Sequence, residues 1–173
     1  MNRRESLKSV ALLSSGLIAL PAWANGWRVD SINVSSSFIS IEDQAILASV
    51  ADTIIPAGNS IGALAVGADK FLLKLFADCY DQAVQSNINA QLKTLDSWAQ
   101  STHGKSFTAL EQIKRLELLM KMSTSEEKAQ KDFFALVKSE TIRGFNTSKE
   151  VMVNFLKYKM LPGHYNGCVD VTA

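Results

Sequence analysis

Apolar side chains recur every three or four positions along most of residues 40–156. This spacing places them on one face of a helix, and the strict alternation that is typical of half-buried strands is not found between turn-forming residues. The pattern therefore predicts an all-α fold, a single compact domain of five to six helices. The expected helices cover residues 40–55, 65–80, 81–102, a stretch that opens at residue 108, residues 123–143 and residues 147–156.

Residues that favour helix ends mark the first and third of these helices. Ser40 is suited to cap the first helix, and two acidic residues follow it in the turn where the helix dipole favours negative charge. Pro56 is expected to end that helix, because a residue before proline is displaced from helical backbone angles. Asp81 and Gly104 are placed as the N-cap and the C-terminal stop of the third helix.

Two capping boxes predict where the fourth and fifth helices start. Thr108 is followed three residues later by Glu111, and Ser123 is followed by Glu126, a spacing in which the two side chains satisfy free amides of the first turn. Gly144 is expected to end the fifth helix.

Each expected helix has an apolar face that should be buried. Taken helix by helix in chain order, the residues on these faces are Ile41, Ala45, Ala48 and Ala51, flanked by Ile46, Val50 and Ile54; Phe71, Leu72, Leu75, Phe76 and Cys79; Val84, Ile88, Leu92, Leu95 and Ala99; Leu110, Ile113, Leu116 and Met120; Phe133, Leu136 or Val137, and Glu140 or Thr141; and Val151 and Phe155.

The first 24 residues have the pattern of a cleaved export signal. Arg3 and Arg4 precede a short apolar run over residues 10–20, and that run is well below the roughly 20 residues that a membrane-spanning helix needs. Ala22 and Ala24 fit the small residues of a cleavage site. We therefore expect residues 1–24 to be a signal peptide, residues 25–39 a linker or arm, and residues 40–173 the helical domain.

The paired arginines are followed by Glu-Ser-Leu-Lys, which resembles a twin-arginine export signal. That route carries proteins that are already folded. An ordinary secretory signal in which Arg3 and Arg4 are adjacent by chance is the alternative.

Charge excludes one class of partner. The 18 lysines and arginines are balanced by 17 aspartates and glutamates, and no long block of one sign occurs. Such a chain lacks the basic surface that binds nucleic acid or an anionic membrane. We expect no nucleic-acid partner.

The two cysteines, Cys79 and Cys168, leave two alternatives open. In an oxidising compartment they are able to pair, and the closed loop would contribute about 4 kcal/mol in the chain-entropy model. Cys79 also falls on the apolar face of its helix, where a buried free thiol is common.

Few residues are candidates for chemistry. His103 and His164 stand alone, without carboxylates at helical spacing, so we expect no metal site. The glycine-rich loop over residues 57–67 lacks the strand before it and the Lys-Ser/Thr after it that a phosphate loop requires. Asp52 stands out because it interrupts an otherwise apolar helix. It either faces solvent or caps a nearby group, or it makes a polar contact with a partner.

Three stretches together resemble the gluconate 2-dehydrogenase subunit 3 family. The first is residues 50–58 (VADTIIPAG), followed by the Gly62–Ala63 loop and residues 68–71 (ADKF). The second is residues 133–141 (FFALVKSET), running into residues 144–148 (GFNTS). The third is residues 156–158 (LKY) and then residues 162–168 (PGHYNGC), and the three stand in this order behind the paired arginines. The pairing of ADTIIP with a terminal PGxYxGC is more specific than either motif alone. The resemblance covers the chain from about Ile41 onward.

The resemblance implies a non-catalytic small subunit of a periplasmic dehydrogenase that is membrane-associated through its complex. The partner would be a flavoprotein large subunit of the glucose-methanol-choline type that carries FAD, with a multihaem cytochrome c as a third subunit. The small subunit would hold no cofactor, and would assist maturation of the large subunit and its export by the twin-arginine translocase. The substrate would be gluconate or, in other members, the 3-hydroxyl of glucosides.

Against this resemblance, Cys79 stands where a bulky aromatic residue is more usual, which weakens the expectation of a disulfide with Cys168. A basic and apolar stretch, residues 159–161, replaces one that is commonly acidic. Pro162, Tyr165 and Cys168 belong to a tail that either packs on its own domain or wraps the partner.

Two other functions stay open at this point. One is a module that docks the dehydrogenase to a cytochrome or to the membrane. The other is a stand-alone periplasmic enzyme whose active site would need a buried polar cluster, formed by Asp52 with His103 or His164.

Overall fold

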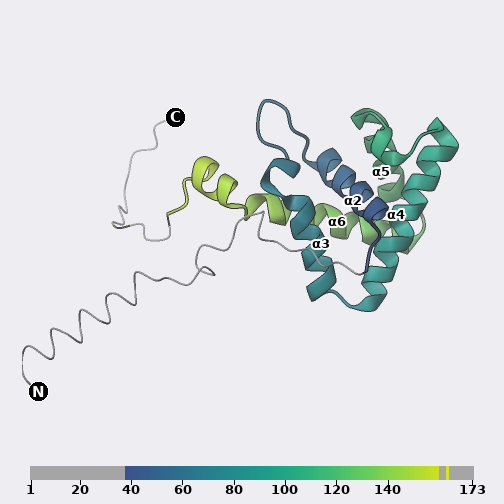
Figure 1. The fold of residues 1–173 in the computed structure, drawn as a ribbon, viewed down its shortest axis with the longest axis horizontal. Helices are drawn as coiled ribbons and strands as arrows, with labels where there is room; N and C mark the ends of the chain where they lie inside the picture. The colour runs from purple at the N-terminus through teal and green to yellow at the C-terminus, as the bar shows by residue number, and fades with distance from the viewer. Residues whose placement is uncertain (1–37, 160–162, 164–173) are drawn as a thin grey trace, which may run out of the picture. The chain divides into compact units, whose positions relative to one another are not determined.

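The computed structural model describes residues 38–159 and residue 163, and helices joined by loops make up this part of the chain, with no strand in it (Figure 1). This confirms the all-α prediction. The elements are α2 (Ile41–Ile54), the 3₁₀ turn η3 (Leu64–Val66), α3 (Ala68–Cys79), α4 (Gln82–His103), the 3₁₀ turn η4 (Phe107–Ala109), α5 (Gln112–Thr124), α6 (Lys128–Asn146) and the π-helical turn η5 (Val151–Phe155).

Several predictions fall outside the described residues. They concern the signal peptide with its cleavage site, nearly all of the arm over residues 25–39, and the tail from residue 164. Within the described residues, no helix combines the length and the apolar character that crossing a membrane requires.

The predicted caps of α2 and α4 are confirmed. The Ser40 hydroxyl accepts the backbone N–H of Asp43 at 3.1 Å, which satisfies one amide of the first turn of α2. The Asp81 carboxylate does the same for Val84 N–H at 2.9 Å at the start of α4. At the other end of α4, Gly104 adopts φ +67° and donates its N–H to the Gln100 carbonyl, which closes the last turn.

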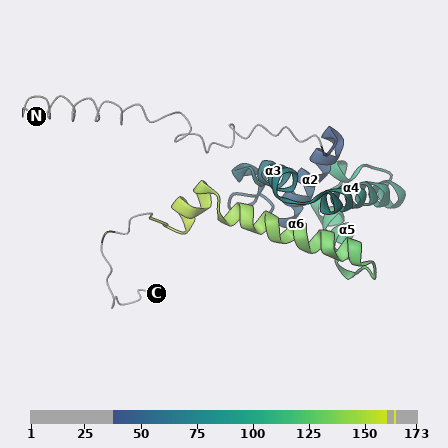
Figure 2. The same cartoon turned by 90° about the horizontal axis from the view of Figure 1, so that it is seen from below.

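Helix α6 holds the bundle together, because it packs against each of the other four α-helices (Figures 1 and 2). Leu47, Leu72, Leu95 and Phe133 come from four different helices, and each is almost fully buried. Apolar surface removed from water in this way contributes roughly 25 cal/mol per Å² to folding. The other large side chains that are almost fully buried are Val50, Phe76, Ile88, Leu92, Phe107, Leu119, Met122 and Val137.

The predicted starts of the fourth and fifth helices are wrong. Residues 107–109 form the turn η4, and α5 begins only at Gln112, with no side chain capping it. Ser123 lies near the end of α5 and donates its hydroxyl to the Met120 carbonyl at 2.7 Å instead of capping a new helix. Helix α6 then starts at Lys128.

Gly144 was expected to end the fifth helix, and this is also wrong. Helix α6 continues to Asn146, and Gly144 is a buried residue within it. A Cβ atom at this position would lie 2.5 Å from Cδ1 of Phe71, so the glycine permits α3 to approach α6 closely. The second helix likewise begins later than expected, at Ala68, after the turn η3.

The predicted buried faces are confirmed for α4, apart from the partly buried Val84, and largely for α6, whereas several other assignments are wrong. Phe133, Val137, Glu140, Thr141 and Val151 are buried as expected. Residues that were expected inside but are exposed are Ile41, Ala45, Cys79, Ile113, Leu116, Met120 and Phe155.

Candidate functional site

One face of α5 carries a stripe of exposed apolar side chains. Ile113, Leu116 and Met120 are 71%, 49% and 50% exposed, and their spacing of three and four residues places them side by side on the helix. We call these three residues the α5 stripe. The opposite face of α5 contributes Leu118, Leu119 and Met122 to the core. The helix is therefore apolar on two faces, and the fold covers only one of them.

The side chain of Arg115 fixes α5 against α2. Its Nη2 lies 3.2 Å from Oδ2 of Asp52, and its Nη1 donates to the Ser49 carbonyl at 3.3 Å. The guanidinium is mostly buried, with a side-chain exposure of 13%. Asp52 thus forms an ion pair within the domain, and its predicted contact with a partner remains a prediction.

A second polar cluster joins the end of α3 to α6. Tyr80 donates its hydroxyl to Oε1 of Glu140 at 3.2 Å, and Oε2 of the same carboxylate pairs with Nε of Arg143 at 2.8 Å. The guanidinium of Arg143 also lies over the ring of Phe71. Burial raises the pKa of Tyr80, and the neighbouring carboxylate raises this pKa further. The cluster fixes how α3 packs against α6.

A polar groove of about 720 Å³ lies between the start of α2 and the C-terminal half of α4. Asp96 borders it and accepts hydrogen bonds from the Ser106 hydroxyl at 2.7 Å and from the Phe107 N–H at 2.9 Å. Burial raises the pKa of Asp96, but these hydrogen bonds, together with one from Gln100, outweigh that effect and lower the pKa. Asp96 therefore works as a structural acceptor that holds η4 against α4.

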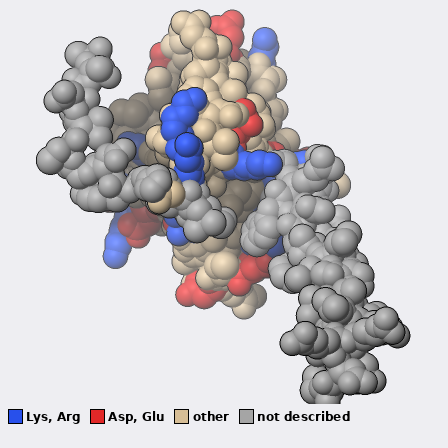
Figure 3. Space-filling view, turned by 90° about the vertical axis from the view of Figure 1, so that its left-hand side faces the viewer, with Lys and Arg blue, Asp and Glu red and all other residues tan. Residues whose placement is uncertain are grey.

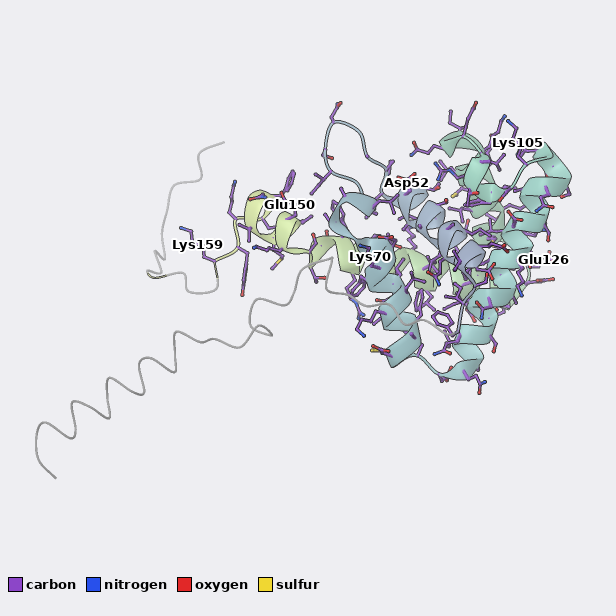
Figure 4. The ribbon with its side chains drawn as sticks, in the orientation of Figure 1. Asp52, Lys70, Lys105, Glu126, Glu150 and Lys159 are labelled. Carbon is purple, nitrogen blue, oxygen red and sulfur yellow. The ribbon has the colours of Figure 1, made fainter. Side chains whose placement is uncertain are left out.

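Exposed apolar residues also gather after α6. Val153, Phe155, Leu156 and Tyr158 are all about half exposed, and we call them the C-terminal apolar segment. Figure 4 shows this part of the chain beyond the end of α6, with Glu150 and Lys159 labelled on it. Figure 3 looks at the molecule from this end and shows basic atoms beside uncharged surface. A small soluble protein rarely leaves so many large apolar side chains together without a binding role.

The residues singled out from the sequence do not come together in one site. Asp52 lies at the contact between α2 and α5, whereas His103 is the last residue of α4. Cys79 ends α3 with an exposed thiol. Arg3, Arg4, Ala22, Ala24, Pro162, His164, Tyr165 and Cys168 lie outside the described residues, so the export signal, the tail contacts and the Cys79–Cys168 pairing stay predictions. Within the part of the chain that the structure describes, no group of three His, Cys, Asp or Glu side chains gathers to hold a metal ion.

Sequence reasoning missed both apolar surfaces. The periodic signal at Ile113, Leu116 and Met120 was found, but it was interpreted as a buried face. Periodicity reports that a face is apolar, and a face covered by a partner has the same pattern as one covered by the chain's own core.

Comparison with known protein families gives one match. The model of the family described as gluconate 2-dehydrogenase subunit 3 matches residues 41–163 of this chain. The match includes the α5 stripe and the C-terminal apolar segment. No curated protein and no solved structure matches the chain.

Proposed function

Because the chain belongs to the gluconate 2-dehydrogenase subunit 3 family, which implies association with a dehydrogenase large subunit, we propose that it is the non-catalytic small subunit that binds a flavoprotein of the glucose-methanol-choline type and accompanies it through export. In this proposal FAD belongs to the large subunit and haem c to a third, cytochrome subunit. The complex works at the periplasmic side of the membrane.

The α5 stripe is the observation that supports a binding role most directly. An amphipathic helix that offers anchors at positions i, i+3 and i+7 fits a hydrophobic groove on another protein. The Arg115–Asp52 pair and the buried Leu118, Leu119 and Met122 hold α5 rigidly on the bundle. A rigid apolar face loses little conformational freedom on binding, which favours affinity.

The export role is supported by the sequence before the described residues. Arg3 and Arg4, followed by Ser-Leu-Lys and a short apolar run, suit a translocase that carries folded proteins. In this proposal the flavoprotein folds around its FAD before it leaves the cytoplasm. A small subunit that binds the folded large subunit and carries the signal would serve both proteins.

The test is to coexpress both subunits and replace Arg3 and Arg4 with lysine. The proposal expects the large subunit, followed by its flavin absorbance and by immunoblot, to remain in the cytoplasm together with the small subunit. Arg28→Lys, a change of the same kind outside the signal, is the matched control and should leave export normal.

Two outcomes would contradict the escort role. One is a large subunit that reaches the periplasm normally in the Arg3→Lys/Arg4→Lys strain. The other is normal export in a strain without the small subunit at all. If electron transfer to quinone then failed, that second outcome would favour a docking module between the dehydrogenase and its cytochrome.

A further inference from the structure

We propose that residues 149–159 form a second docking element, which inserts Phe155, Leu156 and Tyr158 into an apolar groove on the flavoprotein large subunit whose rim carries carboxylates. This inference rests on the proposed function, because it names a further contact with the same partner. It is distinct from the α5 stripe, which lies on another helix.

The segment has a defined backbone shape that presents these side chains. Leu156 N–H donates to the Val151 carbonyl at 3.0 Å, and Tyr158 N–H donates to the Met152 carbonyl at 2.8 Å. Lys157 lies between these two donors and adopts φ +53°, a left-handed conformation that a residue with a side chain seldom adopts. The chain therefore turns back tightly on itself just after η5.

Val151 is the one fully buried side chain of η5, and its neighbour Met152 is partly buried. Val151 is 5% exposed, whereas Val153, Phe155, Leu156 and Tyr158 range from 48% to 60%. A segment that buries Val151, partly buries Met152 and exposes these four apolar side chains leaves most of its apolar surface for another molecule. Aromatic residues such as Phe155 and Tyr158 are the kind that contribute most to binding at interface centres.

The charges around the segment indicate the chemistry of that molecule. Lys149, Lys157 and Lys159 are exposed, and none of them forms an ion pair with another described residue. The one carboxylate of the segment, Glu150, accepts a hydrogen bond from Asn154 (Figure 4 labels Glu150 and Lys159). On this side of the molecule Figure 3 shows basic atoms on uncharged surface, with acidic atoms nearby. Complementary charge at an interface requires carboxylates around the facing groove.

The same charges argue against two other occupants. A second copy of this segment would bring its lysines against those of the first, which repel each other. The chain's own residues 160–173 contain one acidic side chain, Asp170, to set against three lysines. In addition, the family match includes residues 149–159 but stops at residue 163. A large subunit is therefore the occupant that the observations favour.

The test is site-specific photocrosslinking in the complex of full-length subunits. Phe155 is replaced by the photoreactive residue p-benzoylphenylalanine, the complex is irradiated, and the adducts are identified by mass spectrometry. We expect an adduct with the large subunit whose crosslinked peptide lies beside Asp and Glu residues. The same replacement at Ile41, an apolar residue at the start of α2 that is even more exposed than Phe155, is the control and should give no such adduct.

Affinity measurements provide the second arm. We expect Phe155→Ala/Tyr158→Ala to weaken binding to the large subunit at least 30-fold, and Lys157→Glu/Lys159→Glu to slow association and reverse its dependence on salt. Ile41→Ala should leave affinity within twofold. Circular dichroism melting of each variant should match the wild type, because all of the substituted residues are exposed.

Three results would overturn the inference. They are a crosslink from position 155 to residues 160–173 of the same chain, a crosslink to a second copy of this chain, and unchanged affinity in Phe155→Ala/Tyr158→Ala. None of these contradicts the proposed function as long as the wild-type chain binds the large subunit. Failure of the wild-type chain to bind it would instead contradict the proposed function itself.

Discussion

The ring of Phe71 occupies the place where a side chain of residue 144 would lie, because a Cβ atom on Gly144 would approach Cδ1 of Phe71 to 2.5 Å. Alanine is normally better than glycine within a helix by about 1 kcal/mol. Here the added methyl group must displace an aromatic ring between α3 and α6. We expect Gly144→Ala to lower the free energy of unfolding by about 1–3 kcal/mol, measured by urea denaturation.

Gly58→Ala is the control for that prediction, since nothing lies within 4 Å of a Cβ atom at that position. The double variant Gly144→Ala/Phe71→Leu should lose less stability than the sum of its two single variants, because the smaller side chain leaves room for the methyl group. Equal effects of Gly144→Ala and Gly58→Ala would show that the close approach is unimportant.

The ion pair between Arg115 and Asp52 should contribute more to the free energy of unfolding than an ion pair on the surface does. Arg115→Ala removes two hydrogen bonds from a mostly buried site, one to Asp52 and one to the Ser49 carbonyl. We expect a loss of about 1–3 kcal/mol in unfolding free energy. Lys74→Ala breaks the exposed pair with Asp78 and should cost less than about 0.5 kcal/mol. Similar losses for both variants would contradict the structural role of Arg115.

Leu116 and Leu118 lie two residues apart on α5, but the first is 49% exposed and the second 5%. Leu118→Ala should destabilise the domain by about 2–5 kcal/mol, because it opens a cavity in the core. Leu116→Ser should change stability by less than about 0.5 kcal/mol, but weaken binding to the large subunit. Thermal melts and affinity measurements on both variants check that Leu118→Ala lowers stability and that Leu116→Ser lowers affinity. Normal binding by the double variant Ile113→Ser/Leu116→Ser would show that the α5 stripe is not part of the interface.

Asp96 should make stability depend on acid pH. Hydrogen bonds from Ser106, Phe107 and Gln100 lower the pKa of Asp96 in the folded protein. The ionised carboxylate therefore contributes fully to the free energy of unfolding above the unfolded-state pKa of about 4. The contribution is lost as the pH falls through the folded-state pKa. The difference in unfolding free energy between the wild type and Asp96→Asn should therefore be largest near neutral pH and shrink toward pH 3.

Asp78→Asn is the control, because Asp78 is exposed and its carboxylate pairs with Lys74 on the surface of α3. A wild-type advantage over Asp96→Asn that stays constant from pH 7 to pH 3 would rule out the carboxylate charge as its source.

Helix ends were predictable from sequence where one side chain satisfies the backbone locally. Ser40 and Asp81 each cap an amide three residues ahead, and Gly104 adopts the positive φ that its helix end requires. Such contacts depend on neighbours in the chain alone. They survive in the fold because tertiary packing does not compete with them.

The starts of α5 and α6 were mispredicted because other contacts used the same residues. Asp96, ten or eleven residues away, binds Ser106 and the Phe107 amide and stabilises the turn η4 where a helix was expected at Thr108. The role of Gly144 likewise depends on Phe71, which is far away in sequence. A single sequence contains no local signal for either contact.

The exposure of the two apolar surfaces could not be predicted from the sequence for a different reason. A hydrophobic pattern does not say whether the chain itself or another protein covers the face. Only the positions of α2, α4 and α6 around α5 show that Ile113 and Met120 point away from the core.

This arrangement has a consequence for laboratory evolution of the protein. A library screened for expression or heat resistance of the isolated chain would replace Ile113, Leu116 and Met120 freely with polar residues, and would even favour such changes for their solubility. The variants selected by that screen would be stable and well expressed, but they would have lost the apolar face of α5. If the α5 stripe binds the large subunit, as proposed, selection on the assembled complex would reject the same substitutions.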